Sequence, residues 1–136
     1  SKLFQARTVK KNYVALVQGS LHGKGSIDVP LLADWPNRPR QKVDFEQGKP
    51  AKTLYQLLEY QPAQDLSRIL LEPITGRSHQ LRVHLAHIGH PITGDKLYHF
   101  NAAQSPLKRL ALHACHLAFE HPLQGTMLEL KSGVPF

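Results

Sequence analysis

Three basic side chains that could bind an anion lie close together near the middle of the chain, at Arg77, His79 and Arg82. His79 and Arg82 are three residues apart, so on a helix they occupy the same flank. An arginine fork makes two hydrogen bonds to one carboxylate or phosphate. At the edge of an apolar face, such a cation needs an anionic partner. That partner can be a protein carboxylate or a substrate, and the residue types alone favour a structural ion pair.

A short amphipathic helix over residues 78–88 is predicted to carry these side chains. Ser78 is a typical N-cap, and Leu81, Leu85 and Ile88 then repeat at the spacing of one helical face. Gly89 can adopt the left-handed conformation that ends a helix. The predicted helix therefore buries its apolar residues and leaves the arginine beside the buried stripe.

Apolar runs on both sides of this helix predict a sheet. The expected strands cover residues 9–19, 27–32, 51–60, 66–73, 110–120 and 126–131, and residues 1–8 are expected to end a helix. A short polar turn separates the third and fourth of these strands, which favours an antiparallel hairpin. The segments 90–98 and 100–105 are expected to form turns and a loop.

Residues 34–47 are predicted to form a proline-stiffened loop with cations around the only tryptophan of the chain. In such a loop the cations contact phosphates and the indole stacks on a base. This composition suits RNA, and a solvated proline-rich linker is the alternative. The side chains expected to contact RNA are Trp35, Asn37, Arg38, Arg40 and Lys42, followed by Lys49.

The composition excludes several classes of protein. The 136 residues carry a formal net charge of +7, which is compatible with a nucleic-acid partner and equally with none. The single cysteine excludes an internal disulfide framework and a cysteine-rich zinc site. No apolar run reaches the roughly 18 residues of a membrane-spanning helix. These features favour a soluble, cytoplasmic protein.

The nine histidines raise the possibility of a metal site. His84 and His87 are spaced to approach one ion from the predicted helix. However, the helix contains no carboxylate and the His-Glu-x-x-His pattern is absent, so we expect no metal. The Gly-x-Ser-x-Gly motif of hydrolases and the glycine patterns of nucleotide-binding folds are also absent.

The central segment resembles the signature of the RluA family of RNA pseudouridine synthases. Residues 76–84 read Gly-Arg-Ser-His-Gln-Leu-Arg-Val-His, followed by Gly-His-Pro-Ile at 89–92 and Gly-Asp-Lys-Leu-Tyr at 94–98. The tyrosine-containing strand at 10–19, the Asp-Trp-Pro-Asn-Arg-Pro insert at 34–39 and the segment 112–122 are similar to further motifs of the family. The resemblance runs from end to end of the chain in the family's order.

This resemblance implies an α+β fold with a mixed, mainly antiparallel β-sheet and few packed helices. It also implies isomerisation of specific uridines in structured RNA, namely large-subunit ribosomal RNA with a transfer RNA stem-loop as a further substrate. In the family an aspartate attacks the flipped uridine, the glycosidic bond breaks, and the base rotates and rejoins through carbon. The resemblance implies no cofactor, and we expect a monomer.

The resemblance also implies roles for individual residues. Strand periodicity alone favours Tyr13 as a core tyrosine, whereas by the resemblance it would lie in the active site beside the uridine. Arg82 would pair with the nucleophilic aspartate. Arg77 and His79 would face RNA phosphate, while Leu110 or Leu112 would support the base.

One part of the family pattern is missing from the chain. The nucleophile belongs to a His-Arg-Leu-Asp segment upstream of the tyrosine strand, and none of the five aspartates has that context. We therefore expect residues 1–136 to be the C-terminal portion of a catalytic domain that is inactive alone, with Arg82 deprived of its partner and tolerant of substitution. A non-catalytic RNA-binding module, or a degenerate paralogue, is the alternative.

Overall fold

A computed structural model describes residues 7–99, 109–120 and 127–136. In chain order the elements are β1 (Arg7–Gln18), β2 (Lys24–Asp28), β3 (Leu31–Ala33), the 3₁₀ turn η2 (Trp35–Asn37), β4 (Gln41–Val43), β5 (Lys52–Gln61), β6 (Leu66–Pro73), α1 (Gln80–His87), β7 (Leu112–Glu120) and β8 (Met127–Lys131). Within these residues no helix is long and apolar enough to cross a membrane.

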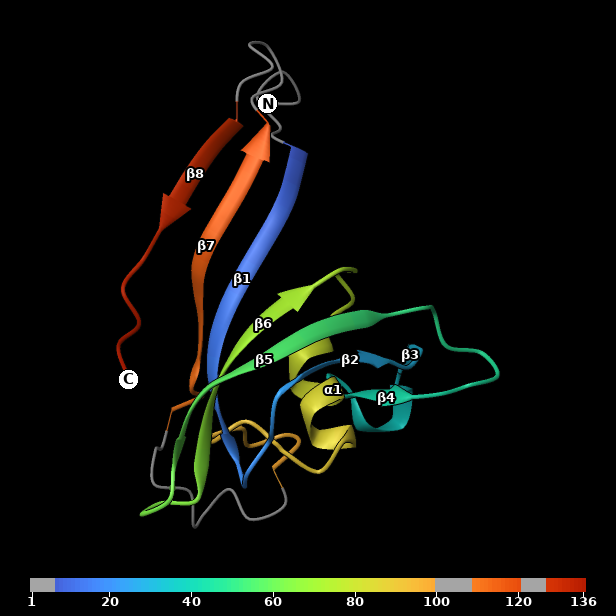
Figure 1. Ribbon diagram of the computed structural model, residues 1–136. Coiled ribbons are helices and arrows are strands. Elements are labelled where there is room, and N and C mark those ends of the chain that lie inside the picture. Colours follow the sequence, from blue (N-terminus) through green and yellow to red (C-terminus); the bar gives the residue numbers. More distant parts are fainter. Residues whose placement is uncertain (1–6, 100–108, 121–126) are drawn as a thin grey trace.

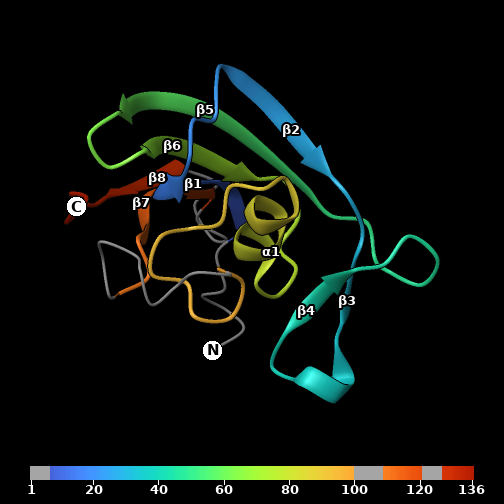
Figure 2. The same ribbon diagram turned by 90° about the horizontal axis from the view of Figure 1, so that it is seen from below.

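Six of the strands form one sheet in the order β2-β5-β6-β1-β7-β8, with β1 near its centre (Figure 1). Every pairing between the described strands is antiparallel. The α+β class and the predicted hairpin of β5 and β6 are therefore confirmed. In Figure 2, α1 lies between this sheet and the small two-stranded sheet of β3 and β4, which extends away from the rest of the chain.

The helix α1 packs its apolar side chains against the centre of the sheet. Leu81 and Leu85 belong to the same buried cluster as Ala15 of β1 and Ile69 of β6. Leu85 is fully buried, so its truncation to alanine would cost about 2–5 kcal/mol. The predicted burial of these leucines is confirmed, and Gly89 adopts the left-handed conformation after the helix, with φ of 85°.

A chain of buried hydrogen bonds fixes the other side of α1. The Gln80 side-chain amide donates to Thr53 Oγ1 at 3.0 Å, and that hydroxyl lies 2.9 Å from His84 Nδ1. His84 Nε2 lies 3.0 Å from the carbonyl oxygen of Val29, which can only accept, so Nε2 carries the proton and Nδ1 accepts from Thr53. Burial lowers the pKa of His84, so this fully buried side chain is a neutral structural residue that ties the helix to β5 and to Val29, just after β2.

The start of α1 differs from the prediction. The helix begins at Gln80, the N-cap residue is His79 in the left-handed region with φ of 54°, and no side chain caps it. Ser78 lies in the preceding turn. The Gln80 side chain accepts from the Arg77 N–H at 3.1 Å and from the Thr75 hydroxyl at 2.6 Å, so it closes this turn in place of a serine cap.

Two predictions about the strands were also wrong. The expected strand at 27–32 is divided between β2 and β3, because Pro30 interrupts the run and has no N–H for a ladder. The expected loop at 34–47 contains β4, which pairs with β3 in the register Leu31 to Val43 and Ala33 to Gln41. We call residues 31–43, from β3 to β4, the basic hairpin.

At the N-terminus, residues 7 and 8 belong to β1 rather than to the end of a helix. The remainder of that predicted helix, and the predicted loop at 100–105, lie outside the described residues.

Candidate functional site

A pocket of about 230 Å³ lies where β1, the end of β6 and the start of α1 meet. It gathers five of the residues that the sequence predicted for the site, which are Tyr13, Arg77, His79, Arg82 and Leu112. Lys11 also lines it. Leu110 does not line the pocket and instead packs against the main core.

The strands explain why Tyr13 and Leu112 reach the same pocket. Leu112 of β7 pairs with Ala15 of β1, and Ala15 lies on the same face of β1 as Tyr13 and Lys11. The pairing of β1 with β7 shifts register between Asn12 and Tyr13. Such bulges re-aim side chains and are frequent next to active sites.

Arg82 is held by a bidentate ion pair. Its Nε donates to Asp95 Oδ2 at 3.0 Å, and its Nη2 donates to Asp95 Oδ1 at 2.8 Å. Asp95 is fully buried, whereas the Arg82 side chain is 20% exposed. The hydrogen bond to Asp95 raises the pKa of Arg82 above its ordinary value, so the guanidinium stays charged. Our expectation that Arg82 has no anionic partner in this chain was therefore wrong.

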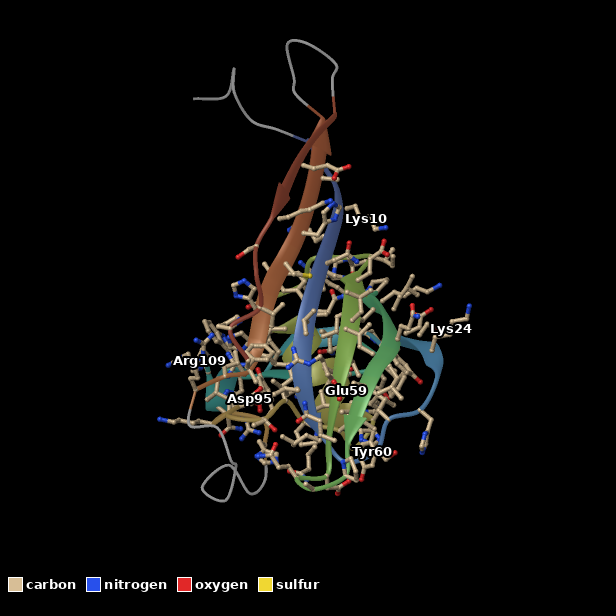
Figure 3. The ribbon with its side chains drawn as sticks, turned by 60° about the vertical axis from the view of Figure 1, so that its left-hand side comes forward. Lys10, Lys24, Glu59, Tyr60, Asp95 and Arg109 are labelled. Atoms are coloured by element: carbon tan, nitrogen blue, oxygen red, sulfur yellow. The ribbon has the colours of Figure 1, made fainter. Side chains whose placement is uncertain are left out.

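The local backbone explains how Asp95 takes this role. Its Oδ1 accepts from the backbone N–H groups of Leu97 at 3.0 Å and Tyr98 at 3.2 Å, within the turn that follows α1. Figure 3 labels Asp95 in this part of the molecule. The sequence predicted only turns for residues 90–98 and no role for Asp95, although an aspartate in a turn often accepts such bonds.

Asp95 cannot attack a substrate. Its carboxylate has no exposed surface, and both of its oxygens accept hydrogen bonds from Arg82. None of the residues found to line the pocket is an aspartate or a glutamate. Within the described residues, the pocket therefore offers cations, a phenol and apolar surface, but no accessible carboxylate.

His79 occupies the boundary between the pocket and the basic hairpin. Its Nδ1 lies 2.7 Å from the Tyr98 hydroxyl, and the two rings meet edge to face at 5.7 Å. Burial, followed by the nearby charge of Arg82, lowers the pKa of His79 below its ordinary value. The imidazole is therefore neutral at neutral pH and can offer a hydrogen bond, but no charge, to a ligand.

The basic hairpin carries most of the residues predicted to bind RNA. Trp35 is 68% exposed, and the guanidinium carbon of Arg38 lies 4.7 Å from its ring centre. The Asn37 amide donates to Asp34 Oδ2 at 3.1 Å, which fixes the tip of the hairpin. Trp35, Arg38 and Arg40 line an open hollow of about 490 Å³ that Ser78 also borders.

The two remaining predicted cations, Lys42 and Lys49, are exposed but do not line this hollow. Arg77, which lines the pocket, donates from Nε to the Pro50 carbonyl oxygen at 2.9 Å. No group of three His, Cys, Asp or Glu side chains in the described part of the chain is arranged to hold a metal ion.

Two residues at this site were missed by the sequence analysis. Lys11 could have been found from strand alternation, since it is two residues before Tyr13. Tyr98 is the last residue of the Gly-Asp-Lys-Leu-Tyr motif, and nothing in the sequence indicated that it reaches back to the basic hairpin. Its hydroxyl accepts a hydrogen bond from the backbone N–H of Gln41 at 2.9 Å.

Comparison with known proteins identifies the family. Residues 1–87 match the family model described as RNA pseudouridylate synthase. The chain belongs to this family. It is 48% identical over 134 residues to the dual-specificity RNA pseudouridine synthase RluA of Escherichia coli strain K12, and 49% identical over 134 residues to the RluA of Pasteurella multocida. Both alignments cover 98% of this chain and 61% of the relative, so the chain spans about three fifths of their length.

Solved structures of family members share the fold. Human RNA pseudouridylate synthase domain containing 1 superposes with a TM-score of 0.79 at 31% identity, covering 93% of this chain and 55% of the human chain. Human RNA pseudouridylate synthase domain containing 4 superposes with a TM-score of 0.66 at 25% identity, covering 93% of this chain and 58% of that one.

Proposed function

We propose that this chain forms part of an enzyme that isomerises uridine to pseudouridine in structured RNA. The observation that carries the proposal is the meeting of Tyr13 and Arg82 in one pocket, in a chain of the RNA pseudouridylate synthase family. The pocket, at about 230 Å³, is smaller than the ~300–1,000 Å³ of typical small-molecule sites, which suits a single flipped base.

The reaction breaks the bond between C1′ of the ribose and N1 of uracil and forms one between C1′ and C5. One proton leaves C5 and one is gained at N1, so the product is an isomer and no electrons are exchanged. No redox cofactor is therefore required. What the site must supply is a nucleophile for the sugar or base, a place for the freed base, and groups that move the proton.

Arg82 is suited to orient a nucleophilic carboxylate. Asp95 uses only the Nε and one Nη2 hydrogen of a group with five N–H donors, so Nη1 lies outside that bidentate pair. A second carboxylate can thus bond the guanidinium on its pocket side without displacing Asp95. We propose that this carboxylate is an aspartate from a part of the protein outside residues 1–136, and that residues 1–136 form the C-terminal portion of the catalytic domain.

We further propose the substrate from the relatives and the basic hairpin. The relatives are named dual-specificity RNA pseudouridine synthases, which supports more than one RNA substrate. We propose large-subunit ribosomal RNA together with a transfer RNA stem-loop. The exposed Trp35 and the cations of the hairpin would meet bases and phosphates outside the pocket. A monomer acting in the cytoplasm fits this proposal.

A non-catalytic RNA-binding module is the second candidate, because no accessible carboxylate lines the pocket among the described residues. A chimaera distinguishes the two. In it, this chain replaces the matching 134 residues of the Escherichia coli relative, so that the relative supplies the rest of the enzyme.

If the chain is catalytic, the chimaera forms pseudouridine in ribosomal or transfer RNA, and Tyr13→Phe and Arg82→Lys lower its rate constant more than its RNA affinity. A chimaera that folds cooperatively and binds RNA but leaves uridine unchanged supports the binding module instead.

A further inference from the structure

The pocket and the hollow of the basic hairpin form adjoining parts of one surface. Arg77 and His79 line the pocket, and Ser78, which lies between them in the chain, borders the hollow. The hairpin itself belongs to a separate two-stranded sheet and extends beyond α1 (Figure 2). Its position relative to the pocket therefore depends on contacts outside the ladder of the main sheet, namely the backbone bridge between Leu31 and Lys49 at its base and contacts made by side chains.

Tyr98 makes contacts with both sides of this boundary. Its hydroxyl accepts from the Gln41 N–H of β4 at 2.9 Å and lies 2.7 Å from His79 Nδ1. Two guanidinium groups lie over its ring, with Arg40 Cζ at 5.6 Å and Arg82 Cζ at 5.4 Å from the ring centre. Its backbone N–H donates to Asp95 Oδ1.

The direction of these hydrogen bonds sets the state of His79. The Gln41 N–H can only donate, so the Tyr98 oxygen accepts from it. We assign the Tyr98 hydroxyl proton to the hydrogen bond with His79 Nδ1, and this assignment places the proton of the neutral His79 on Nε2. The Tyr98 hydroxyl thus fixes both the position of β4 and the hydrogen-bond donor that His79 presents.

We propose that Tyr98 is a positioning residue that holds the basic hairpin against the pocket, so that one RNA strand binds both at the same time. This inference rests on the proposed function, because it takes RNA as the common ligand. The pocket and the basic hairpin, held in a fixed relation, act as two linked binding modules for one RNA. When the connection loosens, the effective concentration of the second module for RNA already bound at the first one falls. RNA affinity therefore depends on Tyr98 even if Tyr98 does not contact the RNA.

The test is Tyr98→Phe in the 136-residue chain. The ring remains beside Leu31 and Val83, which form the apolar cluster under the hairpin, and only the hydroxyl bonds are lost. We expect binding of a fluorescein-labelled stem-loop RNA to weaken about fivefold. In this background, Arg38→Ala should cost less affinity than in the wild type, because the hairpin already contributes less.

Trp35 supplies a second readout, because it is the only tryptophan in the chain. Its fluorescence anisotropy without RNA reports the motion of the hairpin and should fall in Tyr98→Phe. Tyr60→Phe is the matched control. It removes a hydroxyl that donates to Asp65 Oδ1 at 2.6 Å next to the β5–β6 turn (Tyr60 is labelled in Figure 3), and it should change neither RNA affinity nor Trp35 anisotropy.

The inference is overturned if the wild-type chain does not bind the RNA, if Tyr98→Phe binds it as the wild type does, or if Tyr98→Phe and Arg38→Ala have additive effects with unchanged anisotropy. Circular dichroism sets a temperature at which every variant is folded, so a loss of global stability is not mistaken for a loss of positioning. Pseudouridine formation is not measured here. An inactive chimaera therefore contradicts the proposed function alone, and a failure of Tyr98 coupling contradicts this inference alone.

Discussion

Removing Arg82 should destabilise the chain, because Asp95 would remain buried without its cation. The two side chains share two hydrogen bonds, and Asp95 has no exposed surface from which to recover hydration. Breaking a buried ion pair by removing one partner costs about 3–5 kcal/mol. Arg82 is 20% exposed, and Asp95 keeps two backbone N–H donors when the guanidinium is removed. The loss of unfolding free energy caused by Arg82→Met should therefore lie at the lower end of this range, at about 3 kcal/mol.

The assay is a double-mutant cycle of Arg82→Met and Asp95→Asn, followed by urea and thermal unfolding. For a chain of this size, a loss of about 3 kcal/mol lowers Tm by about 10 °C. Asparagine keeps an oxygen for the N–H groups of Leu97 and Tyr98 but removes the charge. The double variant leaves no unpaired buried charge, so it should be more stable than the sum of the single changes by about 2 kcal/mol.

Arg109→Met serves as the matched control, because Arg109 is exposed and loses a charge of the same kind. Its free energy of unfolding should change by no more than about 0.5 kcal/mol. The reasoning is refuted if Arg82→Met is as harmless as this control, or if the cycle shows no coupling. Either result would mean that Asp95 is stable in the core without the guanidinium.

Three further predictions follow from the same contacts. Replacing Arg38, Arg40 and Lys42 together by alanine should weaken RNA binding. Titrations at several salt concentrations should show that the slope of the logarithm of affinity against the logarithm of salt concentration becomes shallower by up to about one unit per lost phosphate contact. An unchanged slope would mean that the hairpin makes no phosphate contacts. Burial lowers the pKa of His84 below 6.5, so the unfolded chain takes up a proton at this residue before the folded chain does as the pH falls. The free energy of unfolding, measured by urea titration at several pH values, should therefore decrease as the pH falls below about 6.5. The decrease should be less steep in His84→Gln. The chain alone should form no pseudouridine in ribosomal or transfer RNA, and chemical labelling that detects it would contradict the assignment of the nucleophile to another segment.

The main sheet and helix could be predicted because their signals are local. The leucine spacing of α1 and the apolar runs of β5 and β6 depend only on which side chains face the core, and the structure has the helix and both strands. The start of α1 could not be predicted in the same way. Gln80 closes the turn by bonding Thr75 and Arg77, and Ser78 was the more obvious cap by residue type.

Several pocket residues were named from the sequence, whereas their connections were not. Tyr13, Arg77, His79 and Arg82 line one pocket. The ion pair of Arg82 with Asp95, 13 residues later, has no periodic signal in a turn-rich segment. The same is true of Tyr98, whose partner Gln41 lies 57 residues away. The part of the basic hairpin that contains β4 was mistaken for a loop, because β4 is only three residues long and contains no extended apolar alternation.

The turn after α1 therefore links the stability of the site to its chemistry. Asp95 neutralises the guanidinium of Arg82 and fixes its direction, while Tyr98, three residues later, fixes His79 and the hairpin. A guanidinium held in this way reorganises little when a second carboxylate arrives, and preorganised charge is more effective in orienting a reacting group than mobile charge. The buried ion pair therefore supports the role that we propose for Arg82, in which the guanidinium orients a carboxylate from another part of the protein.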